Sequence, residues 1–131
     1  VIKCNDADGA ITLPTIKADS KGESAGANDP NANNQLGAVY TFTVMSDSSD
    51  FDIKTDGTDK FVGHATVVNV GDGTNSTFVP ASSNDVISMN GGTTGGDKGS
   101  TVTITALEDD VYLVKAVLIG TGTEATPFAD S

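Results

Sequence analysis

The stretch STVTITAL, residues 100–107, alternates apolar and polar side chains along its length. Val102, Ile104 and Ala106 share one side of an extended chain, and the threonines between them share the other. Successive side chains of a strand point to opposite faces of a sheet, so this period of two predicts one buried face and one solvated face. The stretch therefore predicts a sheet that covers a core with one side only.

Similar short runs of β-branched and aromatic residues recur along the chain, separated by clusters of Gly, Asn, Asp and Ser. Further predicted strands are AITL (10–13), AVYTFTV (38–44), FDIKT (51–55), KFVGHATVVNV (60–70), STFV (76–79) and DVISM (85–89). The dipeptides Asp56-Gly57, Asp72-Gly73 and Asn90-Gly91 lie between them and tolerate the positive φ of tight turns. Helical periodicity is almost absent. We therefore expect one all-β domain over residues 1–131, an antiparallel β-sandwich or a jelly-roll-like barrel.

The run VYLVKAVLI, residues 111–119, differs from the others because both of its faces are apolar. A strand with two apolar faces is either central in the sandwich or pressed against another subunit, and the pattern leaves both alternatives open. The run continues into GTGTEATPFADS, residues 120–131, which is too polar and too rich in glycine to form a core. We expect these residues to form an extended C-terminal tail.

Two other stretches lack any strand periodicity. Residues 17–37 form a long polar segment, and a loop of that length is usually functional or disordered. The stretch NGGTTGGDKGS, residues 90–100, is too rich in glycine for the interior of a strand. It predicts a wide turn or a place where two backbones approach closely.

The composition disfavours nucleic acid and membranes as partners. The 131 residues include 7 Lys and Arg against 18 Asp and Glu, which gives a net charge of −11. Such a charge repels both a phosphate backbone and an anionic leaflet. The longest apolar run, residues 111–119, is half of the roughly 18 residues that a membrane span requires. With Cys4 as the single cysteine, no internal disulfide can form, which fits synthesis in a reducing compartment.

Residues for catalysis are scarce, and we expect no enzymatic activity. The single histidine, His64, lies within a predicted strand, and the chain contains no G-x-S-x-G nucleophile motif. Cys4 has no second cysteine in a CxxC motif and only Lys3 as a nearby cation. The stretch GTGTEATP, residues 120–127, has no lysine and opens no helix, so it is not a phosphate-binding loop.

Carboxylates are plentiful, but their spacing predicts no metal site and no cofactor. Asp29, Asn31 and Asn33 begin an EF-hand spacing, yet Asn34 replaces the required glycine and Tyr40 replaces the required glutamate. The stretch NDADG, residues 5–9, matches no specific pattern and is explained by ordinary turn chemistry. Sugar-binding platforms need exposed aromatic rings, and the chain has only two Tyr, five Phe and no Trp.

The order of segments resembles that of small virion proteins of tailed bacteriophages, especially head decoration or head-fibre proteins of marine phages. The resemblance covers nearly the whole chain apart from residues 17–36. Its most specific parts are ITLP (11–14), the turn NGGTTGGDKG (90–99) before a strand that ends in ITAL (104–107), and the tail GTGTEATPF (120–128). Phage tail-fibre domains contain similar β-repeats.

The resemblance implies a non-enzymatic structural protein that decorates and stabilises the outside of a phage capsid as a homotrimer bound to the major capsid protein. It would be made in the cytoplasm of the bacterial host. The apolar strand and the tail then become candidates for a subunit or capsid interface, with the tail adding to a neighbouring sheet edge. The candidate interface residues are Tyr112, Val114, Leu118, Thr121, Thr123, Thr126, Pro127 and Phe128. The alternative is a receptor- or glycan-binding module of a phage fibre or a cell-surface adhesin.

Overall fold

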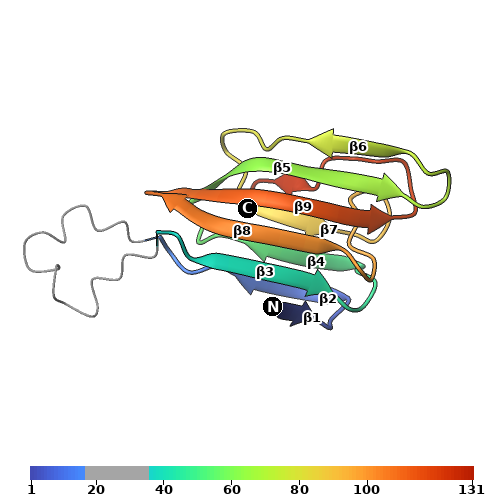
Figure 1. Ribbon diagram of the computed structural model, residues 1–131, viewed down its shortest axis with the longest axis horizontal. Helices are drawn as coiled ribbons and strands as arrows, with labels where there is room; N and C mark the ends of the chain where they lie inside the picture. The colour runs from blue at the N-terminus through green and yellow to red at the C-terminus, as the bar shows by residue number, and fades with distance from the viewer. Residues whose placement is uncertain (17–35) are drawn as a thin grey trace, which may run out of the picture.

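Two sheets pack face to face in this computed structural model, which describes residues 1–16 and 36–131. Figure 1 looks onto the larger sheet, with the smaller one behind it. The described residues contain no helix, and neither sheet closes into a barrel. The prediction of an all-β sandwich is confirmed.

The larger sheet has six strands in the order β1–β3–β8–β9–β5–β6. Their bounds are β1 Ile2–Cys4, β3 Val39–Val44, β8 Thr101–Glu108, β9 Val111–Gly120, β5 Lys60–Asn69 and β6 Asn75–Phe78. The smaller sheet has four strands in the order β10–β7–β4–β2. Their bounds are β10 Phe128–Ala129, β7 Val86–Met89, β4 Asp50–Lys54 and β2 Asp8–Thr12.

Both sheets are mixed, whereas we expected an antiparallel sandwich. Three pairs are parallel, namely β1 with β3, β2 with β4, and β5 with β9. The chain alternates between the sheets over β1, β2, β3, β4 and β5, and each crossing reverses its direction. Two strands of one sheet that are separated in the sequence by one strand of the other sheet therefore run in the same direction, as β1 and β3 do and as β2 and β4 do. Side-chain alternation is identical in parallel and antiparallel strands, so it carries no information on this point.

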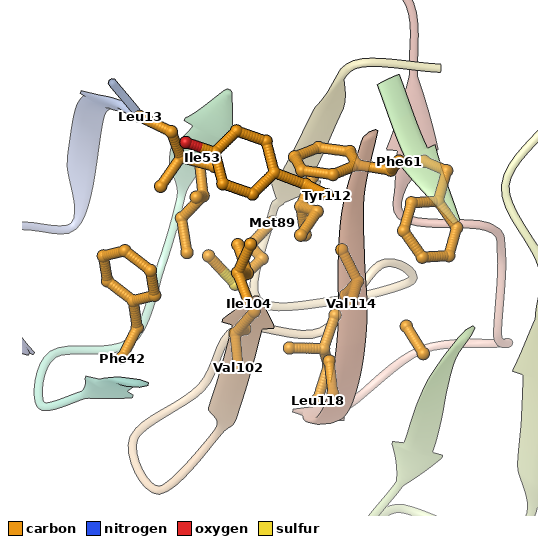
Figure 2. Packing of buried hydrophobic residues seen from close by; sticks show 14 of the residues in the cluster. Leu13, Phe42, Ile53, Phe61, Met89, Val102, Ile104, Tyr112, Val114 and Leu118 are labelled. Atoms are coloured by element: carbon orange, nitrogen blue, oxygen red, sulfur yellow. The ribbon is translucent and has the colours of Figure 1, made fainter. Parts of the chain in front are cut away.

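The core lies between the sheets and receives alternate side chains from each. Figure 2 shows Ile53 and Met89 of the smaller sheet meeting Ile104 and Val114 of the larger one. Tyr112 is fully buried beside the ring of Phe61, and burial raises the pKa of its hydroxyl. The protonated hydroxyl donates to the Pro14 carbonyl oxygen at 2.6 Å. This bond ties β9 to the segment that follows β2.

The glycine-rich stretch 90–100 is a place of close backbone approach, as its composition predicted. A Cβ on Gly120 would overlap the carbonyl oxygen of Gly92, and one on Gly95 would lie 2.5 Å from the Cβ of Leu118. Gly91 and Gly95 have φ of 74° and 75°, the left-handed region that glycine adopts freely. The loop from β7 to β8 can therefore lie directly against the end of β9.

Candidate functional site

Five of the predicted interface residues are buried within their own chain. Tyr112, Val114 and Leu118 point inward from β9, which is an interior strand of the larger sheet. Pro127 and Phe128 are buried as well. The prediction that these five side chains form a subunit or capsid interface is wrong, because all five are already buried within their own chain. Of the two alternatives for the apolar run 111–119, a central strand of the sandwich is therefore confirmed for its inner side.

The tail after β9 also turns back onto its own chain. The amide of Ala125 donates to the Thr93 carbonyl oxygen at 2.8 Å, and that of Ser88 donates to the Pro127 carbonyl oxygen at 2.8 Å. β10 then pairs with β7 at an edge of the smaller sheet. The prediction of a tail that reaches beyond its own domain is wrong.

The last residue of the chain, Ser131, is bound near the start of β7, whereas Ala125 is bound to the loop that follows β7. The backbone amide of Ser131 donates to the Asp85 carboxylate at 2.7 Å, and the same carboxylate accepts from Lys60 Nζ at 2.7 Å. Thr121, Thr123 and Thr126 remain exposed, so a role for these three in an interface stays a prediction. The predicted polar loop, residues 17–37, lies almost wholly outside the described residues, which resume at position 36.

Cys4 and His64 lie on opposite sides of the larger sheet. Cys4 faces the core, and burial raises the pKa of its thiol, which disfavours the reactive thiolate. His64 is exposed on the outer side, where its cross-strand neighbour is Lys115. The two residues therefore cannot act together on one substrate.

The described residues offer no metal centre. Within residues 1–16 and 36–131, no group of three or more His, Cys, Asp or Glu side chains is arranged to hold a metal ion. The EF-hand-like spacing that begins at Asp29 lies outside the described residues.

The outer side of the larger sheet is the broadest surface that the strands build. Its residues follow from the strand registers, and we call them the outer sheet face. They are Lys3 of β1; Val39, Thr41 and Thr43 of β3; Thr101, Thr103 and Thr105 of β8; Leu113, Lys115, Val117 and Ile119 of β9; Val62, His64, Thr66 and Val68 of β5; and Asn75 and Thr77 of β6. Seven of them are threonines and six are aliphatic.

Cross-strand pairing arranges these side chains in rows. One row runs from Thr43 through Thr101 and Val117 to Thr66 and Thr77. The hydroxyls of Thr66 and Thr77 form a hydrogen bond of 2.9 Å across β5 and β6. The next row carries Thr41, Thr103, Lys115 and His64, and a third carries the aliphatic side chains of Val39, Leu113 and Val62 beside Thr105. The sheet thus presents ordered rows of side chains, most of them threonine or aliphatic.

The charge on the outer sheet face contrasts with that of the whole chain. The ionisable residues among its members are Lys3, His64 and Lys115, although the chain has a net charge of −11. The next row, at the hairpin end of β8 and β9, pairs Lys60 and Glu108 with Val111, so the face ends on one carboxylate. The smaller sheet turns Asp8, Asp50 and Asp52 outward on the opposite side, together with Lys54. The sandwich therefore has one face with a single carboxylate at its border and one acidic face.

A second unusual feature is a buried carboxyl group at one end of the sandwich. Asp59, between β4 and β5, is 0% exposed, and its Oδ2 accepts from the Ile16 amide at 2.9 Å. Burial raises the pKa of this carboxyl above its ordinary value of 3.8; the Ile16 amide opposes the rise, and the charges of Asp56 and Asp110 add to it. Oδ1 has no hydrogen-bond partner. The carboxylate of Asp110, within hydrogen-bonding reach, cannot donate unless the pair takes up a proton.

We expect Asp59→Asn to raise the free energy of unfolding at pH 7 by roughly 1 kcal/mol, the contribution of one added hydrogen bond. The amide oxygen of asparagine can still accept from Ile16, and its NH₂ group can donate to Asp110. Because the pKa of Asp59 is raised on folding, the native state binds more protons than the unfolded state above the unfolded pKa. The contribution of Asp59 to stability therefore falls as pH rises through the folded pKa, so the gain from asparagine shrinks at low pH.

Urea denaturation of both proteins between pH 4 and pH 8 measures this difference. Asp59→Ala is the control, since it removes the acceptor for Ile16 and should lower stability. An asparagine variant that is less stable than the wild type at pH 7 would contradict the expectation.

None of the described segments forms a helix with the length and hydropathy that crossing a bilayer requires. What the chain does is inferred from its own residues, since no family model, no curated protein and no solved structure matches it.

Proposed function

We propose that this chain is a non-enzymatic structural protein of a tailed-phage virion, bound as a homotrimer to the outside of the assembled capsid. Its partner is the major capsid protein, and it is made in the cytoplasm of the bacterial host. The proposal begins from the resemblance of ITLP, the turn 90–99 and the segment 120–128 to phage head proteins. The observation that carries it is the outer sheet face, a broad surface with a single carboxylate at its border on a strongly acidic domain.

A structural role fits what the described residues offer. The thiol of Cys4 is buried, and His64 lies among threonines, aliphatic side chains and Lys115. The net charge of −11 keeps the domain away from packaged nucleic acid and favours the exterior of the particle. Three weak contacts made by one trimer add up, because the second and third become intramolecular once the first has formed.

The alternative of a receptor- or glycan-binding module has no observation in its favour. All seven aromatic residues of the chain are described, and none of them is exposed. Tyr40 and Phe78 are half-buried against the core, and the other five are buried. A stacking platform for sugar rings needs such side chains at the surface.

The test uses heads of the phage that encodes the chain, prepared from a deletion of its gene. We expect the purified chain to co-sediment with these heads and to saturate at a fixed ratio to the major capsid protein. Light scattering of the free chain should give the mass of a trimer. Failure to bind the heads would contradict the proposal, and labelled chain found only on fibres would favour the alternative.

A further inference from the structure

We propose that the outer sheet face is the surface by which this protein docks, and that its occupant is a flat protein surface of neutral to acidic character. This inference rests on the proposed function, in which that surface is the exterior of the capsid shell. It goes beyond that function because it names the side of the sandwich that meets the shell.

Charge complementarity favours the outer sheet face over the other sides of the sandwich as the docking surface. Apart from Glu108 at the end of β8, the described carboxylates lie at the turns and on the smaller sheet, where Asp8, Asp50 and Asp52 point outward. Any approach through those parts places the carboxylates of this chain against the partner. The outer sheet face brings Lys3, His64 and Lys115, which attract carboxylates on the partner, and has the single carboxylate of Glu108 at its border.

The size of the face is sufficient for a specific contact. The six neighbouring strands have three to ten residues each, and at about 4.8 Å between strands and 3.4 Å per residue they cover roughly 700 Å². A standard interface buries about 800 Å² on each partner. The longest strands, β5 and β9, lie side by side in this sheet and give it its length.

The side chains of the face are suited to forming an interface at low entropic cost. Most are Thr, Val or Ile, whose branching at Cβ restricts χ1 before any partner is met. Docking therefore costs these side chains little conformational entropy, whereas Lys and Glu side chains would lose much more rotamer freedom. Val39, Val62 and Val117 are exposed aliphatic groups that a partner would remove from water.

A second copy of this chain is a poorer occupant. A two-fold, face-to-face pair brings the row with Lys115 and His64 against the same row of the other copy.

Two lysines on opposite sides of the sandwich supply a matched test. Lys115 lies on the outer sheet face and Lys54 on the outer side of the smaller sheet, and each is changed to glutamate. Both variants change the net charge by the same amount, so any long-range effect of charge is equal. We expect Lys115→Glu to weaken co-sedimentation with the gene-deleted heads at least tenfold, and Lys54→Glu to change it less than twofold. Thermal melting of each variant identifies those that remain folded.

A second pair tests the apolar part of the face in the same way. Val117 is 49% exposed on the face, and Val79 is 73% exposed at the end of β6. Loss of head binding by Val117→Glu but not by Val79→Glu supports the inference. Equal binding by wild type, Lys115→Glu and Val117→Glu overturns it and leaves the capsid role intact.

Two other outcomes also overturn the inference. Wild-type chain that does not bind the heads at all removes both the docking face and the proposed function. An oligomer of the free chain that Lys115→Glu converts into a monomer shows that a second copy occupies the face.

Discussion

Replacing Gly63 with alanine is expected to lower the free energy of unfolding by roughly 4 kcal/mol or more, which is at the extreme of single substitutions. Gly63 lies in β5 opposite Val114 of β9, with a φ of 108°. A Cβ at this position would overlap the Val114 carbonyl oxygen and lie 3.0 Å from the Val114 backbone nitrogen and carbonyl carbon. These backbone atoms belong to the longest strand pair of the protein and cannot move without breaking it.

Alanine substitutions at two other glycines distinguish the steric overlap from the conformational cost of a positive φ, the two causes of this loss of stability. Gly73 has a φ of 77°, and a Cβ added there would meet no atom within 4 Å, so Gly73→Ala reports the conformational cost alone, about 1–2 kcal/mol. Gly92 has an ordinary φ, and the nearest atom to an added Cβ lies at 3.6 Å, so Gly92→Ala should have little effect. Urea denaturation measures all three. If Gly63→Ala costs no more than Gly73→Ala, the close approach of β5 to β9 is not as described.

Truncating Phe128 to alanine is expected to cost roughly 3–5 kcal/mol, the usual range for a buried phenylalanine. Phe128 is 5% exposed, belongs to the core cluster and pairs with Ile87 across β10 and β7. The cavity left by the ring would lie at the edge of the smaller sheet. The same reasoning predicts that deleting residues 121–131 unfolds the domain rather than dissociating folded subunits.

Thr123→Ala is the control within the tail, since Thr123 is exposed, and a change of less than about 0.5 kcal/mol is expected there. Thermal and urea unfolding of the two variants give the comparison. A Phe128→Ala protein as stable as Thr123→Ala would mean that the tail does not contribute to the core in solution.

Most strands of four or more residues could be predicted from the sequence, because their β-branched and aromatic residues stand between clusters of turn-forming residues and, in the longer strands, alternate with polar ones. The alternation of Val102, Ile104 and Ala106 with threonines corresponds to the buried and outer sides of β8. The predicted strands 38–44, 60–70 and 85–89 likewise correspond to β3, β5 and β7. β1 and β10 were missed, because strands of three and two residues are too short to show a period.

The candidate site was less accessible to sequence reasoning. The run 111–119 is apolar on both sides, and only strand order shows that Tyr112, Val114 and Leu118 are covered by the chain's own second sheet. The threonines of β3 and β8 were visible as solvated positions. These threonines form one surface with the outer side chains of β9 and β5 only through pairing between strands far apart in the sequence.

By itself, the sequence determined the all-β class, the positions of most strands, and the side of each alternating strand that faces water. These properties depend on neighbours two residues apart, so a local pattern contains them. Tertiary structure alone decided the parallel pairing of β5 with β9, the return of the tail through β10, and the burial of Asp59. Each of these depends on contacts between distant segments, whose free energy no local pattern encodes.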